Sequence, residues 1–163
     1  MKVNSFKEAM ANYPTGVSVV TAIDENDNPI GLTVNSFASV SVDPLLILWS
    51  IDNKVSTYEA FKKVDQFAVN ILADDQEKIA STFARSIDSH ERFANSRWYQ
   101  SEHHLPIIKD ATATLQCKTF KQVEAGDHII FIGEIMEIDA EKKYPLLYHG
   151  RKMGAFPESF HKD

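Results

Sequence analysis

Short hydroxyl and amide side chains are concentrated in one stretch of the chain, residues 31–52. Such side chains place hydrogen-bond donors and acceptors close to the backbone, which suits a planar, heteroatom-rich ligand lying against a strand edge. They also suit the solvent-facing side of an amphipathic strand, and the pattern alone favours that simpler interpretation. The stretch is therefore a candidate binding surface, formed by Thr33, Asn35, Ser36, Ser39, Ser41 and Ser50.

The motifs of nucleophilic, phosphate-loop and metal chemistry are missing from the sequence. The six glycines form neither G-x-G-x-x-G nor G-x-x-x-x-G-K, and no G-x-S-x-G is present. Cys117 is the only cysteine, which excludes an intramolecular disulfide and argues against a cysteine-based metal site. Its place in an apolar strand predicts a core residue rather than a nucleophile. His90, His103 and His104 lack metal-ligand spacing, so they are predicted to be surface histidines and no metal is expected.

The length and composition predict one globular domain spanning residues 1–163, because 44% of the residues are hydrophobic. The net charge of −6 argues against nucleic acid as a partner, since phosphate backbones are bound by basic surfaces. No run of about 18 apolar residues is present, so no membrane span is expected. The N-terminal segment MKVNSFKEAM lacks an apolar signal core, and a cytoplasmic location is therefore expected.

Three short helices are predicted to accompany the candidate surface. Capping-box patterns open helices at Ser5 and Ser56, and the segment Asp74-Asp75-Gln76-Glu77 is predicted to cap a third. These helices are expected to end near residues 13, 63 and 85. Residues 86–110 form a long polar segment, which predicts an irregular loop that is functional or covers another element. The apolar residues of the first helix fall on one face: Phe6, Ala9, Met10 and Tyr13.

The remaining segments predict six or seven β-strands that follow one another as hairpins. Polar turns at residues 24–29, 43–44 and 124–127 separate alternating or β-branched runs. The last run, residues 128–138, is apolar on both sides and is predicted to be buried on both faces, with Gly133 marking a bulge or a close backbone approach. This succession indicates an all-β fold, an antiparallel β-barrel with short helices. The predicted strands lie near residues 17–23, 30–36, 37–42, 45–49, 66–72, 111–123 and 128–138.

Several segments, taken in order, share the pattern of one known family. They are YPTGVSVVT at residues 13–21, GLTVNSF at 31–37, SVSVDP at 39–44, FAVNIL at 67–72, Phe83-Ala84, Gly126-Asp127-His128, FIGE at 131–134, and YHGR at 148–151 with Gly154. In these segments the chain resembles the flavin reductase family, small FMN-binding split barrels that supply reduced flavin to two-component monooxygenases. The resemblance covers nearly the whole chain.

The resemblance implies a six-stranded antiparallel Greek-key split barrel, usually a homodimer, with FMN or FAD near the subunit interface. It places one group of residues along the isoalloxazine ring and the ribityl chain: Thr33, Val34, Asn35 and Ser36. It adds a second group from the next strand: Ser50, Ile51 and Asp52.

The resemblance places the flavin phosphate at Ser56 and Thr57, and a local physical reason agrees with it. These residues open a predicted helix, where free backbone N–H groups and the helix dipole attract anions, and Lys54 is close in sequence. The alternative is that Ser56 only caps the helix. Ala84 and Arg85 match a family contact to flavin, although Arg85 also fits a cation that satisfies carbonyls at a helix end.

His128 matches the histidine that the family places near the nicotinamide of NADH or NADPH. Because the cofactors carry the hydride chemistry, His128 would position the dinucleotide or balance charge on the reduced flavin. The alternative is a turn-end histidine that faces solvent. The resemblance also places the closing segment, with Tyr148 and Gly154, over the nicotinamide. Trp49 either lines the flavin pocket or fills the barrel, which leaves the choice between FMN and FAD open.

The resulting hypothesis is an NAD(P)H-dependent flavin reductase that transfers hydride from nicotinamide to FMN or FAD and supplies reduced flavin to a partner monooxygenase. Arg151 and Lys152 are candidates for a contact that selects NADPH, but they also fit a solvated charge pair. One alternative is an FMN-binding electron-transfer protein on the same barrel, without NAD(P)H oxidation of its own. A further alternative is a flavin-free binding domain.

Overall fold

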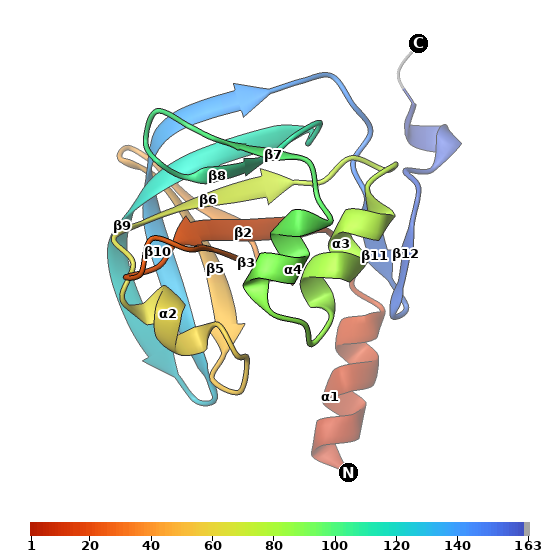
Figure 1. Ribbon diagram of the computed structural model, residues 1–163. Helices are drawn as coiled ribbons and strands as arrows, with labels where there is room; N and C mark the ends of the chain where they lie inside the picture. The colour runs from red at the N-terminus through yellow and green to blue at the C-terminus, as the bar shows by residue number, and fades with distance from the viewer. Residues whose placement is uncertain (162–163) are drawn as a thin grey trace.

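The alternating and β-branched segments of the sequence pair as hairpins into one seven-stranded antiparallel sheet that curls into a barrel (Figure 1). The computed structural model describes residues 1–161. The strand order is β3-β2-β6-β9-β10-β5-β4, and every neighbouring pair is antiparallel, so the predicted antiparallel barrel is confirmed. The strand bounds are Ser18–Ile23 (β2), Pro29–Val34 (β3), Ala38–Val42 (β4), Leu45–Asp52 (β5), Gln66–Ile71 (β6), Ala113–Ala125 (β9) and His128–Ala140 (β10).

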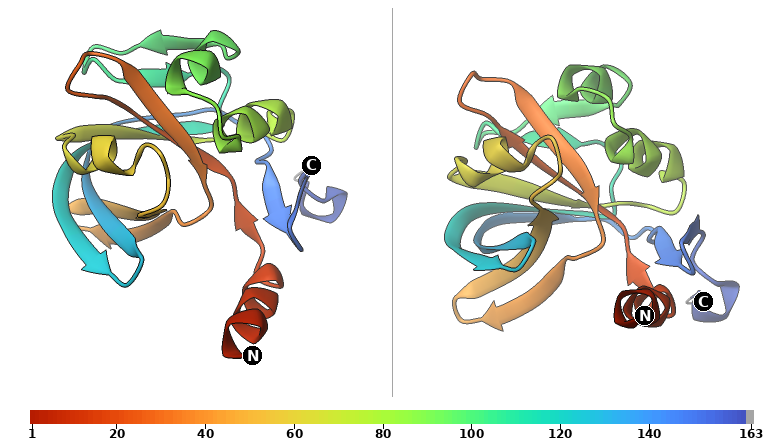
Figure 2. Two further views of the ribbon diagram at one scale, coloured as in Figure 1. Left: turned by 60° about the horizontal axis from the view of Figure 1, so that its bottom comes forward. Right: turned by 90° about the horizontal axis from the view of Figure 1, so that it is seen from below.

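Smaller sheets and short helices surround this barrel. β1 (Thr15–Gly16), β11 (Leu147–His149) and β12 (Lys152–Gly154) form a three-stranded sheet, while β7 (Trp98–Gln100) and β8 (Pro106–Ile108) form a hairpin. The helices are α1 (Lys2–Ala11), α2 (Tyr58–Lys62), α3 (Glu77–Ala84) and α4 (Ser89–Ala94), with a 3-10 turn at Glu158–Phe160. α3 and α4 pack against β3, whereas α1 projects away from the barrel (Figure 2). No helix within residues 1–161 combines the length and apolar character needed to cross a membrane.

The barrel interior is filled by aromatic side chains around Trp49. The indole is fully buried and stacks on Phe131, with ring centroids 4.7 Å apart and planes 13° apart. Phe61 and Phe67 meet the indole edge-on at 5.2 and 5.7 Å. Of the two roles considered for Trp49, the structure shows that of filling the barrel. Cys117 is buried in the same cluster, and burial raises its pKa to about 12, as expected of a core cysteine rather than a nucleophile.

Residues 86–110 form α4 and the β7–β8 hairpin instead of an irregular loop. α4 begins after Asp88, whose carboxylate accepts a hydrogen bond from the Glu91 N–H at 2.8 Å. The hairpin covers the barrel at β2 and β6, and the buried Ile108 N–H donates to Asn70 Oδ1 at 3.0 Å. The prediction of an irregular loop is wrong because the capping pattern of Asp88 and Glu91 starts a helix. The prediction that the segment covers another element is confirmed.

Two of the other helices begin at residues that differ from the predicted ones. α1 already includes Ser5, α2 begins two residues after Ser56, and α3 follows Gln76. The expected caps at Ser5 and Ser56 are therefore wrong, whereas the N-cap of α3 is Gln76, inside the predicted segment 74–77. A capping pattern is a weak local preference, and the packing that fixes where the chain enters each helix overrides it.

β10 buries one face rather than both. Ile129 and Phe131 point into the barrel and are buried, whereas Ile130 and Ile132 are half-buried and Ile138 is exposed. The prediction of a strand buried on both faces is wrong because a strand of an antiparallel barrel has an inner and an outer face. Apolar residues on the outer face of such a strand remain at the surface of the subunit.

Gly133 lies where β10 passes close to the side chains of neighbouring strands. The register of β9 and β10 shifts beside it. A Cβ placed on Gly133 would lie 2.9 Å from the Cys117 Cβ and closer still to the Phe67 ring. The sequence predicted a bulge or a close backbone approach at Gly133, and the structure shows both.

Substitution of Gly133→Ala is expected to destabilise the protein by about 1–3 kcal/mol, because the added methyl group overpacks the core. Urea denaturation followed by tryptophan fluorescence measures the free energy of unfolding. Gly16→Ala is the control, since a Cβ at Gly16 meets nothing within 4 Å. That control is expected to change stability by less than about 0.5 kcal/mol. Equal stability of Gly133→Ala and the wild type would contradict this account of the core.

Candidate functional site

A cavity of about 590 Å³, which we call the Ser56 cavity, opens between the end of β5 and the segment joining α3 to α4. It brings together four residues that the family resemblance assigns to one ligand, although they come from two distant segments: Asp52, Ser56, Ala84 and Arg85. The complete lining is Asp52, Lys54, Val55, Ser56, Ala84, Arg85, Ser86, Ile87, Asp88 and Arg92.

β3 is an end strand of the barrel sheet, and within residues 1–161 it pairs with β2 alone. Its other edge therefore carries backbone N–H and C=O groups without a strand partner. The Thr33 hydroxyl donates to the Ala80 carbonyl in α3 at 2.6 Å, and Val34 is buried in the barrel core. Asn35, the next residue, is exposed. The edge thus offers a ligand its backbone groups and the Asn35 amide, whereas the Thr33 hydroxyl fixes α3.

Ser36 links the end of β3 to the middle of β5. Its hydroxyl oxygen lies 3.0 Å from the Ser50 backbone nitrogen, which donates to it, and 3.0 Å from the Ser50 carbonyl, which accepts from it. Ile51 is buried in the core, and Asp52 ends β5 at the Ser56 cavity. The predicted residues on β5 therefore connect the β3 edge with the cavity, but the Ile51 side chain points into the barrel.

The structure weakens the helix-terminus argument for Ser56 and Thr57. α2 spans only Tyr58–Lys62, and such a short helix has little dipole to offer an anion. Ser56 makes no side-chain cap, so the interpretation of Ser56 as a helix cap alone is wrong. Thr57 is buried, and its hydroxyl has no hydrogen-bond partner within residues 1–161. An anion at this place would depend on the side chains around the cavity rather than on α2.

His128 begins β10 and lies opposite Asp52 across the β5–β10 ladder. Its Nδ1 is 2.7 Å from an Asp127 carboxylate oxygen, and its side chain is 41% exposed. An ionised carboxylate only accepts hydrogen bonds, so Nδ1–H donates and Nε2 is left for other contacts. This hydrogen bond, followed by the charge of His128, holds the pKa of Asp127 below its ordinary value. Ligand atoms of these three residues lie within 4.8 Å of one another, close enough to hold a metal ion, but exposed acidic groups commonly gather without one.

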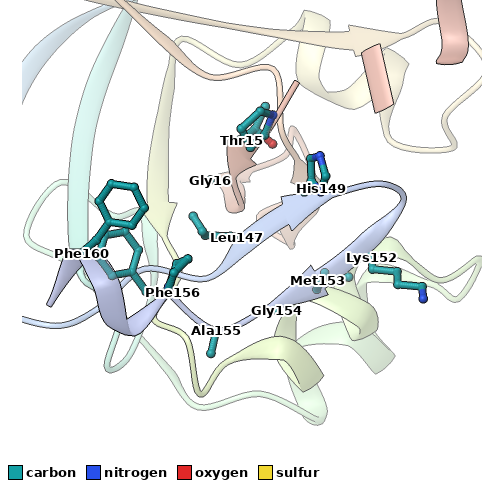
Figure 3. A pocket seen from close by; sticks show the side chains of 12 residues that line it. Thr15, Gly16, Leu147, His149, Lys152, Met153, Gly154, Ala155, Phe156 and Phe160 are labelled. Atoms are coloured by element: carbon teal, nitrogen blue, oxygen red, sulfur yellow. The ribbon is translucent and has the colours of Figure 1, made fainter. Parts of the chain in front are cut away.

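A second cavity of about 720 Å³ lies beside the three-stranded sheet (Figure 3). Gly154 lines it together with Thr15 and the Phe156 ring. Tyr148 pairs with Thr15 in the β1–β11 register and packs, partly buried, against the core. Within residues 1–161, neither Tyr148 nor Gly154 lines the Ser56 cavity.

Arg92 is a cavity residue that reasoning from the sequence missed. It is only 4% exposed, and its two terminal nitrogens donate to the Gly31 carbonyl in β3 at 2.6 Å and to the Arg85 carbonyl at 2.7 Å. Arg92 therefore connects β3 with the end of α3. The sequence contains a usable signal for it, because Asp88 and Glu91 mark the start of the helix that carries it.

The chain matches the family model described as "Flavin reductase like domain" over residues 10–157. It is 42% identical over 134 residues to the reductase component of the flavin-dependent trigonelline monooxygenase of Acinetobacter baylyi, a match that covers 82% of this chain and 43% of that protein. It is 37% identical over 152 residues to the FMN reductase (NADH) SmoA of Agrobacterium fabrum, covering 93% and 85% of the two proteins. The solved structure of an NADH:FAD oxidoreductase from Streptomyces globisporus, in complex with NAD and FAD fragments, has a TM-score of 0.90 at 30% identity over 98% and 95% of the two chains. The chain thus spans less than half the length of the first relative and most of the second.

Substitution of His128→Gln is expected to raise the pKa of Asp127 towards the ordinary aspartate value of about 3.9, because it removes the main cause of the lowered pKa. NMR titration of the Asp127 side-chain carboxyl measures this pKa. Lys54→Gln is the control, since Lys54 makes the smallest of the contributions that lower it. An Asp127 that titrates alike in wild type and His128→Gln would show that the 2.7 Å contact does not form in solution.

Proposed function

Because the chain belongs to the flavin reductase-like domain family, we propose that it is an NAD(P)H:flavin oxidoreductase that delivers reduced flavin to a flavin-dependent monooxygenase. Hydride passes from the nicotinamide to FMN or FAD. The observation that carries this proposal is the Ser56 cavity, which gathers Asp52, Ser56, Ala84 and Arg85. The names of two relatives, a monooxygenase reductase component and an FMN reductase (NADH), support it.

The residues around the Ser56 cavity fit a flavin nucleotide. A planar ring lying along the free edge of β3 would meet backbone donors and acceptors and the Asn35 amide. The phosphate end would enter the cavity, where Lys54, Ser56 and Arg85 supply cationic and hydroxyl donors. A bound flavin supplies the ring that accepts hydride, and the protein binds and orients that ring. The volume of about 590 Å³ lies within the range of about 300–1,000 Å³ typical of ligand sites.

His128 positions the nicotinamide in this proposal. Its Nδ1–H is committed to Asp127, which leaves Nε2 to contact the dinucleotide. Hydride transfer needs the two rings held at about 3–3.5 Å, so a side chain of fixed orientation is of more use here than a strong base. We place Tyr148 and Gly154 near the nicotinamide as well, because the resemblance puts the closing segment over it. The strands that carry these two residues border the second cavity.

We propose that the protein works as a homodimer, because apolar side chains stand on its outer surface. α1 buries none of its residues, and its Phe6 and Met10 are exposed. Val42 in β4 is 85% exposed, and Ile138 in β10 is exposed as well. A second copy that covers these side chains removes apolar surface from water. It also offers a route by which Tyr148 reaches a Ser56 cavity, since Tyr148 does not line the Ser56 cavity of its own chain.

We place this reductase in the cytoplasm. Its one cysteine, Cys117, is a buried free thiol, which fits a reducing compartment where disulfides are rare. The partner would be a second protein in the same compartment, reached by diffusion of the reduced flavin.

Anaerobic mixing of the purified protein with excess NADH and either FMN or FAD is expected to bleach the visible absorption of the flavin, with turnover when free flavin is added. The rates rank the two flavins, and NADPH in place of NADH ranks the hydride donors. Tight flavin retention on desalting with negligible NAD(P)H oxidation would instead select the electron carrier. A colourless protein whose melting temperature ignores both flavins would select the flavin-free binding domain.

Sedimentation velocity is expected to give a dimer for the wild type and a monomer for the double variant Phe6→Glu, Met10→Glu, because two charges on the apolar face of α1 oppose its burial. Lys7→Glu is the matched control on the same helix, since it changes the charge without removing apolar surface. A wild type that sediments as a monomer at micromolar concentration would contradict the proposed dimer.

A further inference from the structure

Arg92 is a buried cation without a buried counter-charge. Its terminal nitrogens bond only to the backbone carbonyls of Gly31 and Arg85, and none of the ion pairs found within residues 1–161 includes it. Its Nε is buried and has no hydrogen-bond partner in that part of the chain. Arginine is rarely buried without an anion, because removing its charge from water is costly. Burial lowers the pKa of Arg92, yet arginine keeps its proton in proteins.

The side chains that line the Ser56 cavity carry more positive than negative charge. The cations Lys54, Arg85 and Arg92 line it together with the two carboxylates of Asp52 and Asp88. Both carboxylates already accept hydrogen bonds at 2.8 Å, Asp52 from the Lys54 backbone N–H and Asp88 from a backbone N–H in the first turn of α4. A third carboxylate, Asp127, lies within 4.8 Å of Asp52 and is bonded to His128. None of these carboxylates pairs with Arg92 within residues 1–161, which leaves its guanidinium able to attract an anionic ligand group.

Arg92 also joins the two walls of the proposed flavin site. The Gly31 carbonyl belongs to β3, whose free edge would hold the flavin ring, and the Arg85 carbonyl follows α3 at the Ser56 cavity. The packing around Gly31 is close, because a Cβ there would lie 2.9 Å from the Phe83 ring and 3.3 Å from the Phe93 ring. β3, α3 and α4 therefore meet at one guanidinium.

We propose that Arg92 is the positioning residue that makes the site select phosphorylated flavins, FMN or FAD, over riboflavin, which has no phosphate. This inference rests on the proposed function and adds to it. The guanidinium holds β3 and the end of α3 in place, and it lines the Ser56 cavity as a cation that no carboxylate within residues 1–161 pairs with. The flavin phosphate supplies the negative charge that the protein does not provide around Arg92.

The test compares the binding of FMN and riboflavin, followed by flavin fluorescence, in wild type and Arg92→Gln. The wild type is expected to bind FMN about tenfold or more tightly than riboflavin, and Arg92→Gln is expected to lose most of that ratio. Arg92→Lys keeps the charge and is expected to keep more of the ratio than Arg92→Gln. Arg97→Gln is the matched control, because Arg97 is exposed, pairs with Asp110 at 3.1 Å and does not line the Ser56 cavity.

The outcomes separate this inference from the proposed function. A purely structural Arg92 would weaken FMN and riboflavin binding by the same factor, and an unchanged ratio in Arg92→Gln would overturn the inference. A wild type that binds the two flavins equally well would overturn it too, while leaving the proposed reductase intact. A wild type that binds no flavin would overturn the proposed function itself.

If Arg92→Gln does not fold, a measurement on the wild type still tests whether the Ser56 cavity holds the flavin phosphate, as the inference requires. Inorganic phosphate, compared with sodium chloride at equal ionic strength, is expected to weaken FMN binding by competing for the Ser56 cavity. It is expected to leave riboflavin binding unchanged, because riboflavin puts no anion there. Phosphate that leaves FMN binding unchanged would overturn the inference.

Discussion

The barrel sheet ends in two strands, β3 and β4, that do not pair with each other within residues 1–161, and the site depends on this open seam. Unpaired strand edges attract other strands or ligands, so proteins cover them. Here α3 and α4 cover part of the β3 edge through the bonds from Thr33 to Ala80 and from Arg92 to Gly31. The exposed end at Asn35 is left for the proposed flavin. The backbone groups of β3 that no strand pairs with are thus the ones that a planar ligand can use.

The barrel was predictable because local turns join most of its strands. Asp24 shows how local this information is, since its carboxylate accepts hydrogen bonds from the backbone N–H groups of Asn26 and Asn28 in the turn between β2 and β3. Once such a turn is fixed, the hydrophobic pattern sets the hairpin register. The pairing of β6 with β9 is different, because these strands are far apart in sequence and no local pattern specifies their contact.

The site was less predictable than the fold. The resemblance selected Asp52 and Arg85, and the structure gathers both around one cavity, but their contact with flavin stays a prediction. The sequence pattern did not predict that Arg92 is buried at the cavity, because arginine is usually exposed and because Arg92 lies in a polar segment without apolar periodicity. Its burial follows from the packing of α4 on β3, a tertiary contact that residue type does not reveal. The helix argument for Ser56 failed for a related reason, since the length of α2 is set by packing.

The protonation state and burial of Cys117 determine how readily hydrogen peroxide would oxidise it. Reduced flavin that meets oxygen yields hydrogen peroxide, and peroxide oxidises cysteine thiolates far faster than thiols. With a pKa raised to about 12, Cys117 carries the thiolate in only about one molecule in 10⁵ at pH 7, and burial shields even that fraction. The chain contains no other cysteine. If the proposed reductase reaction releases peroxide, this chain offers it no thiol that is readily oxidised.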